Sequence, residues 1–281
     1  MKGLLLRPPG GPIRVYARPG GNPLQLLGLE TAALGPGMTH SGEADELERC
    51  ILLIGGHCTV AVEGKEWKDI GERPTPFDGL PHAIYVPRDS AWEVRGPDIG
   101  EVTVAITSAP ADNRHEPYHM LPEETDTVYA GRKNWRREIS YPLHGGLIAD
   151  KLLVGEIRTG AGHWSSSPPH RHEITQMPDE VFMEEIYYFK FRPSSGFGAQ
   201  FLYTDDREID NAYLVRDGDA VALPRGYHPS VAGPGYAKYY MCMLAGDNRM
   251  LAPRYDPDHA WLLDADRLID LPPDPHPPGM V

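Results

Sequence analysis

Glycine and proline recur along the whole chain and divide it into short segments. There are 30 glycines and 29 prolines in 281 residues, spread between apolar stretches instead of gathered in one linker. Many of these stretches, such as CTVAVEG, EVTVAIT and EIYYFKF, are rich in Val, Ile, Tyr or Phe, as strands are. Long helical periodicity is nearly absent, and residues 258–271 are the one segment that suggests a short helix. The sequence therefore predicts an all-β fold.

Two successive blocks of the chain carry similar landmarks in the same order. In the first block, TAALGPGMTHSG leads to Glu48 and later to VPRDSAWEV. In the second, EIRTGAGHWSSSPPHRH leads to Glu185 and later to LPRGYHPSV. A repeat of this length suggests one structural unit per block, and a chain of 281 residues is long enough for two hydrophobic cores. We predict two β-barrel domains, residues 1–130 and residues 131–281.

The balance of charge restricts the possible partners. With 27 basic and 40 acidic residues the formal net charge is −13, so the average surface potential repels a polyphosphate. Nucleic acid is therefore not expected as a partner. A small anionic substrate would need a local positive charge or a metal ion to overcome the same field. The charge balance thus favours an enclosed pocket over a surface patch as the binding site.

The N-terminal segment and the cysteines bear on location. The run MKGLLLRPPGG is too interrupted for a secretory leader, and no stretch of about 18 apolar residues follows it. The three cysteines, Cys50, Cys58 and Cys242, form no CxxC pair, and we interpret them as buried free thiols. We expect a cytoplasmic protein that does not associate with membranes.

The densest group of possible metal ligands lies in the second block. One residue separates His170 from His172, so on an extended chain both imidazoles project from the same face, about 7 Å apart. Glu185 opens a strand-like segment, and His228 follows a Gly/Pro turn. Each feature alone also occurs in turns and at solvated strand edges, but together they indicate one site. Three imidazoles and a carboxylate suit Zn, Mn, Fe or Ni, so we predict one divalent metal ion held by His170, His172, Glu185 and His228.

The segment around His228 resembles a motif of the cupins, a family of small β-barrels. That motif, Gly-x5-Pro-x-Gly-x2-His-x3-Asn, is matched by Gly218, Pro224, Gly226 and His228. One residue is missing before the histidine, and Ala232 stands in place of the asparagine. The resemblance implies a jelly-roll-like barrel for this block and, with the repeat, a bicupin for the chain.

The other cupin motif, Gly-x5-His-x-His-x3-4-Glu-x6-Gly, is stretched in this sequence. The loop EITQMPDEVFME separates His172 from Glu185, and Arg192 stands where the last glycine would be. We expect this inserted loop to fold over the mouth of the barrel.

Across nearly the whole chain the sequence is similar to a family of bacterial bicupins, the 5-deoxy-glucuronate isomerases of myo-inositol catabolism. The similarity is carried by SPPHRHE, MEEIYYFKF, GFGAQFLYT, VRDGDAVALPRGYHP and AGPGYAKYYMCMLAG. It implies an aldose–ketose isomerase that converts 5-deoxy-D-glucuronate, a sugar acid, to 5-dehydro-2-deoxy-D-gluconate through a metal-stabilised enediolate. The related pectin-pathway ketol-isomerase, which acts on 5-keto-4-deoxyuronate, holds zinc with three His and one Glu, and this implies zinc on the four predicted ligands.

The implied reaction also needs a group that moves a proton and a cation that binds the substrate carboxylate. For the proton, Tyr187 shares strand phase with Glu185, and the inserted loop offers acids such as Glu173. For the carboxylate, Arg225 and Lys238 lie near the predicted ligands in sequence. We therefore take Tyr187 and Glu173 as catalytic candidates, and Arg225 and Lys238 as substrate-binding candidates.

The first block lacks the predicted ligand set. Glu48 and Gly55 keep the spacing of the carboxylate half-motif, but only His40 precedes them, and Trp92 stands where the later histidine would be. We expect this barrel to be metal-free and to act as a scaffold and as an interface of a homo-oligomer.

Three other functions are compatible with the same residues. One is an isomerase of another deoxy-uronate, such as the pectin-type 5-keto-4-deoxyuronate. Another is a cupin dioxygenase, which uses iron in a similar site and consumes oxygen, so metal content and oxygen uptake distinguish it. The last is a non-enzymatic cupin that binds a sugar or serves as a storage protein, for which intact metal ligands are unusual.

Overall fold

A computed structural model describes residues 3–246 and 248–268. Strands make up most of the regular structure, and α1 (Trp261–Leu268) is the only α-helix in this part of the chain, beside the short 3-10 turns η1 (Pro122–Glu124) and η2 (Lys133–Trp135). The expected helix at residues 258–271 is thus present as α1, and its last three predicted residues lie outside the described residues. No described helix is both long and apolar enough to cross a membrane.

The first half of the chain forms two antiparallel sheets. The larger sheet has the order β11-β8-β5-β10-β3-β2. Its strands are β2 (Ile13–Ala17), β3 (Gly28–Leu34), β5 (Leu47–Gly55), β8 (Ala83–Val86), β10 (Val102–Pro110) and β11 (Tyr118–Met120). The smaller sheet has the order β4-β9-β6-β7 and consists of β4 (Thr39–Gly42), β6 (Cys58–Val62), β7 (Lys65–Ile70) and β9 (Trp92–Arg95).

The second half repeats this arrangement. Its larger sheet has the order β1-β20-β17-β22-β14-β13-β12. The strands are β1 (Leu5–Leu6), β12 (Thr127–Ala130), β13 (Arg137–Leu143), β14 (Leu152–Thr159), β17 (Glu184–Arg192), β20 (Ala220–Leu223) and β22 (Ala237–Ala245). The smaller sheet, β15-β21-β18-β19, consists of β15 (Trp164–Ser165), β18 (Phe197–Tyr203), β19 (Asp210–Arg216) and β21 (Ser230–Ala232). A separate pair is formed by β16 (His170–Arg171) and β23 (Arg254–Tyr255).

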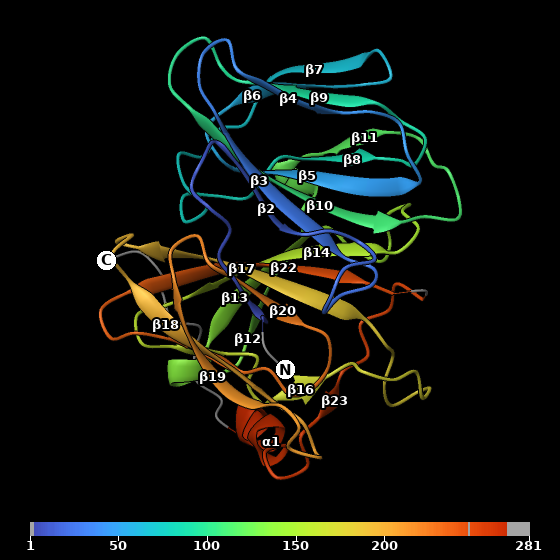
Figure 1. Ribbon diagram of the computed structural model, residues 1–281. Coiled ribbons are helices and arrows are strands. Elements are labelled where there is room, and N and C mark those ends of the chain that lie inside the picture. The colour runs from blue at the N-terminus through green and yellow to red at the C-terminus, as the bar shows by residue number, and fades with distance from the viewer. Residues whose placement is uncertain (1–2, 247, 269–281) are drawn as a thin grey trace.

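The strand orders show which elements of the two halves are equivalent. The run β8-β5-β10-β3-β2 corresponds to β20-β17-β22-β14-β13, and β4-β9-β6-β7 corresponds to β15-β21-β18-β19. In Figure 1 the halves are stacked with their large sheets adjacent and their small sheets at opposite ends. The internal repeat seen in the sequence therefore matches a repeat in strand order.

The strand pairing does not follow the predicted division after residue 130. Strand β12, which ends at Ala130, pairs with β13 of the second half. At the N-terminus, β1 pairs with β20 of the second half, and Arg7 forms an ion pair with Asp219 at 2.7 Å. Both segments thus add edge strands to the second large sheet. The contribution of β1 could not be predicted from the sequence, because a two-residue strand has no periodicity to recognise.

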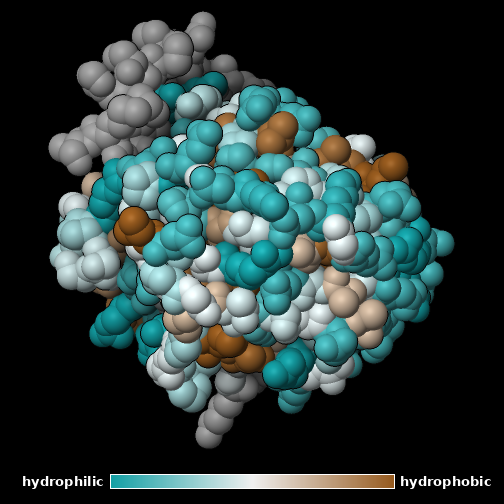
Figure 2. Space-filling view, turned by 90° about the horizontal axis from the view of Figure 1, so that it is seen from above, coloured by the Kyte–Doolittle hydropathy of each residue, from teal (hydrophilic) through white to brown (hydrophobic). Residues whose placement is uncertain are grey.

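The two halves share a hydrophobic core where their large sheets meet. A single buried cluster includes Leu29 and Leu52 of the first half together with Ile186 and Met241 of the second. The inner faces of the first half form a separate buried cluster, which includes Val60. The outer end of the first half, seen from above in Figure 2, is largely hydrophilic, and hydrophobic residues appear only in small separate groups.

Two buried carboxylates join the halves in equivalent ways. Glu48 on β5 accepts backbone N–H groups from residues 150–152, at 2.6 to 2.8 Å. Glu184 on β17 accepts N–H groups from residues 25–27, the shortest at 2.7 Å. Hydrogen bonds to an ionised carboxylate are stronger than those between neutral groups. The structural counterpart of Glu48 is therefore Glu184, and the alignment of Glu48 with Glu185 was wrong by one residue.

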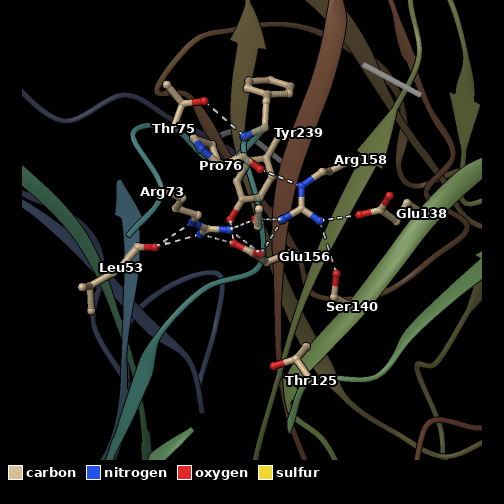
Figure 3. A network of polar contacts seen from close by, with 12 residues as sticks. Leu53, Arg73, Thr75, Pro76, Thr125, Glu138, Ser140, Glu156, Arg158 and Tyr239 are labelled. Atoms are coloured by element: carbon tan, nitrogen blue, oxygen red, sulfur yellow. Dashed lines mark hydrogen bonds and ion pairs between the residues drawn. The ribbon is translucent and has the colours of Figure 1, made fainter. Parts of the chain in front are cut away.

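A buried polar network also crosses between the halves (Figure 3). Arg73, from the segment between β7 and β8, donates to both oxygens of Glu156 on β14, at 2.8 and 2.5 Å. Arg158 donates to Glu156 at 3.1 Å and to Glu138 at 2.6 Å, and the Tyr239 hydroxyl donates to Glu156 at 2.6 Å. Burial alone would raise the pKa of Glu156, but Arg73, Arg158 and Tyr239 outweigh burial and hold that pKa below its ordinary value. Glu156 is thus an ionised carboxylate in the core.

Candidate metal centre

Strand β17 presents neighbouring glutamates to opposite sides of its sheet. Because side chains alternate along a strand, Glu184 points to the first half, where it accepts the amides of residues 25–27. Glu185 points into the second barrel instead, toward His172 and His228. Tyr187 follows in the same phase, and its hydroxyl lies 3.0 Å from Ser166 Oγ. The structure therefore places Glu185 and Tyr187 inside the barrel, as the strand phase predicted.

Three of the four predicted ligands form one compact group. Glu185 Oε2 lies 3.1 Å from His172 Nε2 and 3.3 Å from His228 Nε2. One ligand atom from each of these side chains lies within 4.8 Å of the others, and all three residues are buried. Distances of this order allow one ion to contact all three side chains after small adjustments.

The Nδ1 atoms of His172 and His228 are held by backbone carbonyl groups. His172 Nδ1 lies 2.6 Å from Met183 O, and His228 Nδ1 lies 2.9 Å from Gly226 O. A carbonyl oxygen can only accept, so each Nδ1 carries the hydrogen, and in the neutral ring Nε2 is left with a lone pair. His228 Nε2 is buried without a hydrogen-bond partner among the described residues. Two lone pairs and a carboxylate oxygen converge here, which is the donor set a divalent cation needs.

The turn before His228 depends on glycine. Gly226 has a φ of +95°, and a Cβ at this position would lie 2.7 Å from Tyr203 O. Only glycine fits both the left-handed conformation and the close approach. Because Gly226 also supplies the carbonyl that holds His228 Nδ1, the Pro-x-Gly turn positions the histidine directly.

His170 lies at the more exposed edge of the group. Its ring centroid is 4.7 Å from that of His228 and 6.4 Å from that of His172. It is anchored through β16, where it pairs with Tyr255 of β23. His170 falls outside the group of three whose ligand atoms lie within 4.8 Å, so its side chain would have to turn to become the fourth ligand.

The charge states of the imidazoles follow from their surroundings. Burial lowers the pKa of His170 to about 3, helped by neighbouring His172 and Arg137, and burial lowers the pKa of His228 to about 3. Both rings are neutral at physiological pH, as metal ligands must be. For His172 burial acts in the same direction, but the Glu185 carboxylate outweighs it and raises the pKa. The Glu185 carboxylate thus stabilises one positive charge beside it, which can be a proton on His172 or a bound metal ion.

The ligand group opens into a small cavity of about 240 Å³. The walls include His170, His172, Glu185 and Tyr187, and the remaining lining residues are Ala130, Arg137, Ile139, Tyr141, Ile157, Ser166, Tyr240, Cys242, Leu244, Leu251, Pro253 and Tyr255. Pockets for drug-sized ligands are typically about 300–1,000 Å³. This cavity therefore suits a small metabolite.

The inserted loop does not line the cavity itself but is hydrogen-bonded to the segment near the C-terminus, which does. Val181 N–H donates to Ala252 O at 3.0 Å, and Leu251, Pro253 and Tyr255 line the cavity. Inside the loop, the buried Glu180 carboxylate accepts the N–H groups of Glu173 and Ile174 at 2.7 and 3.3 Å. Glu180 therefore holds the loop in shape.

Glu173 does not face the cavity. Its Oε1 lies 3.2 Å from Arg171 Nη1, and Arg171 also pairs with Glu180 and Asp205. Alternation along the chain explains this, because residues 171 and 173 flank His172 and point away from the side on which His172 faces Glu185. The structure gives no support for Glu173 as a catalytic residue.

The two predicted substrate-binding cations also lie outside the cavity lining. Arg225 pairs with Asp206 at 3.1 Å and with Glu208 at 2.5 Å, at a partly exposed position. Lys238 is fully buried and donates to Ser230 Oγ at 2.6 Å. Burial lowers the pKa of Lys238 well below its ordinary value. Nearness in sequence was a poor guide, because the strand that carries Lys238 places it beyond the cavity wall.

The first half has no counterpart of the ligand group. With Glu48 equivalent to Glu184, the position of Glu185 is taken by Arg49, which forms two hydrogen bonds with Asp45 at 2.8 and 2.5 Å. The segment that bears His170 and His172 is absent, because only residues 43–46 join β4 to β5, whereas residues 166–183 join β15 to β17. Within the described residues, the one group able to hold a metal through three or more such side chains lies in the second half.

Comparison with known proteins agrees with this architecture. A model of the KduI/IolB family matches residues 10–262. The chain belongs to the KduI/IolB family. A KduI/IolB relative from Geobacillus kaustophilus, named 5-deoxy-glucuronate isomerase, is 36% identical over 242 residues, which cover 86% of this chain and 87% of the relative.

Solved structures extend the KduI/IolB comparison to the fold. The crystal structure of an IolB-like protein from Salmonella typhimurium is 31% identical, with a TM-score of 0.88, and the match covers 92% of this chain and 99% of that one. A Bacillus subtilis oxalate decarboxylase shares the fold alone, with a TM-score of 0.57 and 11% identity over 82% of this chain and 71% of its own. The predicted fold class, an all-β bicupin, is confirmed by these likenesses and by the strand content.

Proposed function

We propose that this KduI/IolB protein is an aldose–ketose isomerase that converts 5-deoxy-D-glucuronate to 5-dehydro-2-deoxy-D-gluconate in inositol catabolism. The observation that supports it most is the convergence of His172, Glu185 and His228 beside a cavity of metabolite size. The relatives named 5-deoxy-glucuronate isomerase give the reaction, and a sugar acid fits the cavity in size. A cytoplasmic location and a homo-oligomeric state belong to the same proposal.

We assign a divalent metal ion to His172, Glu185 and His228, with His170 as fourth ligand and zinc as the expected metal. The residues fit such an ion, since His228 Nε2 is buried without a hydrogen-bond partner among the described residues. The Nδ1 atoms of His172 and His228 are held by carbonyl groups, which leaves each Nε2 to bind the ion. When bound, a divalent ion polarises the carbonyl and hydroxyl oxygens of a substrate and so makes the C–H bond between them more acidic.

Tyr187 is our candidate for proton donation within the cavity. Burial raises the pKa of its phenol well above the ordinary value, and the Glu185 carboxylate adds to this. The phenol therefore keeps its proton at neutral pH and can donate it, but it is a poor base. The hydrogen bond with Ser166 Oγ holds the hydroxyl in place.

The cavity lining limits which acids take part and how much water is present. Glu185 is the only carboxylate among the described residues that line the cavity. Acids of the inserted loop are therefore not available for proton transfer in this conformation. Leu251, Pro253 and Tyr255 cover part of the site, and a site from which water is displaced by bound substrate strengthens the charge interactions within it.

The proposal is tested by NMR on metal-loaded protein incubated with 5-deoxy-D-glucuronate. We expect signals of the 2-deoxy ketose acid to appear without oxygen consumption, and we expect no turnover after removal of the metal by a chelator. Oxygen uptake would point to a dioxygenase instead. Turnover of 5-keto-4-deoxyuronate alone would point to the pectin-type reaction.

A further inference from the structure

One cationic side chain reaches the cavity that carries the candidate metal ligands. Among the described residues that line it, Arg137 is the only arginine or lysine. Arg137 begins β13, which is separated from β17 by β14 and β22 in the sheet. Three strand spacings amount to roughly 14 Å along the sheet before its curvature is considered. Arg137 therefore enters the cavity from a different side than Glu185.

Arg137 has no acidic partner in the described part of the chain. Its Nη1 donates to Ser167 O at 3.1 Å and is within 3.5 Å of Trp135 O. No ion pair is formed, and Nε and Nη2 make no hydrogen bond to described residues. A guanidinium has five N–H donors in a planar fork that matches a carboxylate. Most of that donor capacity is not used by the described residues, and Arg137 is one of the residues that line the cavity.

Two arginines close to the ligands in sequence differ from Arg137 in having carboxylate partners. Arg171 is paired with Glu173, Glu180 and Asp205, and Arg225 with Asp206 and Glu208. A chain with a formal charge of −13 repels anions on average. An unpaired, partly buried cation is costly unless an anion compensates it, and a bound ligand can supply that anion.

We propose that Arg137 binds the carboxylate of the sugar acid and makes the site select acids over neutral sugars. This inference rests on the proposed function, because it assumes that the substrate reacts at the ligand group. A six-carbon sugar acid carries its aldehyde and its carboxylate at opposite ends. Arg137 holds one end while the other end faces His172 and Glu185. The Arg137 guanidinium and the substrate carboxylate are both planar, so they can form two parallel hydrogen bonds.

The test compares the sugar acid with its neutral counterpart, in which CH2OH replaces the carboxylate. Binding of each compound to metal-loaded protein is measured by calorimetry, and turnover is measured by NMR. We expect Arg137→Gln to weaken binding of the acid roughly 10- to 100-fold and to leave binding of the neutral sugar nearly unchanged. The loss should appear mainly in KM, with metal content unchanged, and Arg137→Lys should restore part of the preference.

Arg225→Gln is the matched control, because it removes an arginine whose carboxylate partners lie outside the cavity lining. We expect this variant to keep the wild-type preference for the acid. The inference is wrong if Arg137→Gln keeps that preference, or if it weakens both compounds equally, as a purely structural role would. If the wild type binds the acid but converts neither compound, the proposed function is wrong, and the binding ratio still decides the role of Arg137.

Discussion

Glu184 and Glu185 are adjacent in the chain, yet their carboxylates lie on opposite sides of β17. Glu184 accepts three backbone N–H groups from residues 25–27 of the other half. Glu185 faces His172 and His228. One residue joins the halves, and its neighbour belongs to the candidate metal centre. Stability and metal binding can therefore be separated by changing one residue at a time.

Glu184→Gln should lower the free energy of unfolding without loss of metal. The variant keeps one carbonyl acceptor but loses the charge that strengthens these hydrogen bonds, so we expect about 1–3 kcal/mol. Urea denaturation measures the loss, and elemental analysis measures the metal. Glu185→Gln should show the reverse pattern, with reduced metal content and a nearly unchanged fold. Equal metal content in the two variants would contradict the assignment.

Gly226→Ala should weaken metal binding by displacing His228. The left-handed φ and the contact of 2.7 Å with Tyr203 O leave no room for a Cβ, and changes in groups that orient a ligand typically cost about 10- to 100-fold in metal affinity. Gly235→Ala is the control, because Gly235 has a φ of +82° with no atom within 4 Å of a Cβ. Metal titration should detect a loss in the first variant only. A loss of similar size in both would mean that backbone strain alone is responsible.

Tyr187→Phe should lower kcat while leaving metal content and Tm nearly unchanged. Removal of a proton donor typically costs about 10²-fold or more. Tyr188→Phe is the matched control, since Tyr188 lies on the other side of the strand, with its ring edge-to-face with Tyr16 at 5.7 Å. Wild-type kcat in Tyr187→Phe would show that Tyr187 is only a wall of the cavity.

The buried carboxylate of Glu156 should make the free energy of unfolding depend on pH. Its pKa is lowered in the folded protein, so its contribution is fully present above the unfolded pKa of about 4.3 and is lost as the pH falls through the folded value. At pH 7, Glu156→Gln should cost about 3–5 kcal/mol, because Arg73 would lose its buried partner. Urea denaturation between pH 7 and pH 3 should show this difference shrinking at the acid end.

The exposed pair of Glu93 and Arg95 provides the comparison for Glu156. Glu93→Gln should leave the free energy of unfolding nearly unchanged at every pH, because solvent screens such pairs. A difference between wild type and Glu156→Gln that stays constant down to pH 3 would contradict the assignment of an ionised Glu156.

The sequence was informative where a feature is local and periodic. Short apolar segments between Gly and Pro predicted the strands, and alternation along residues 184–187 separated Glu184 from Glu185. The HxH pair and the Pro-x-Gly turn located His172 and His228, which the fold brings to Glu185. In each case the side-chain direction follows from the backbone conformation of a few residues.

Features that depend on distant segments were missed or misplaced. Arg137 lies in a charged stretch, and only the pairing of β13 with β14 brings it to the cavity. Arg225 and Lys238 were chosen because they are close to the ligands in sequence, but their contacts lie elsewhere. The homo-oligomer stays a prediction, which sedimentation can check.

The most direct test of the central claim is metal content measured together with isomerisation, in the wild type and in the double variant His170→Ala/His228→Ala. We predict about one divalent ion per chain and conversion of 5-deoxy-D-glucuronate by the wild type, and neither metal nor conversion in the variant. A variant that keeps full metal content, with a metal-loaded wild type that does not interconvert the two sugar acids, would contradict the claim.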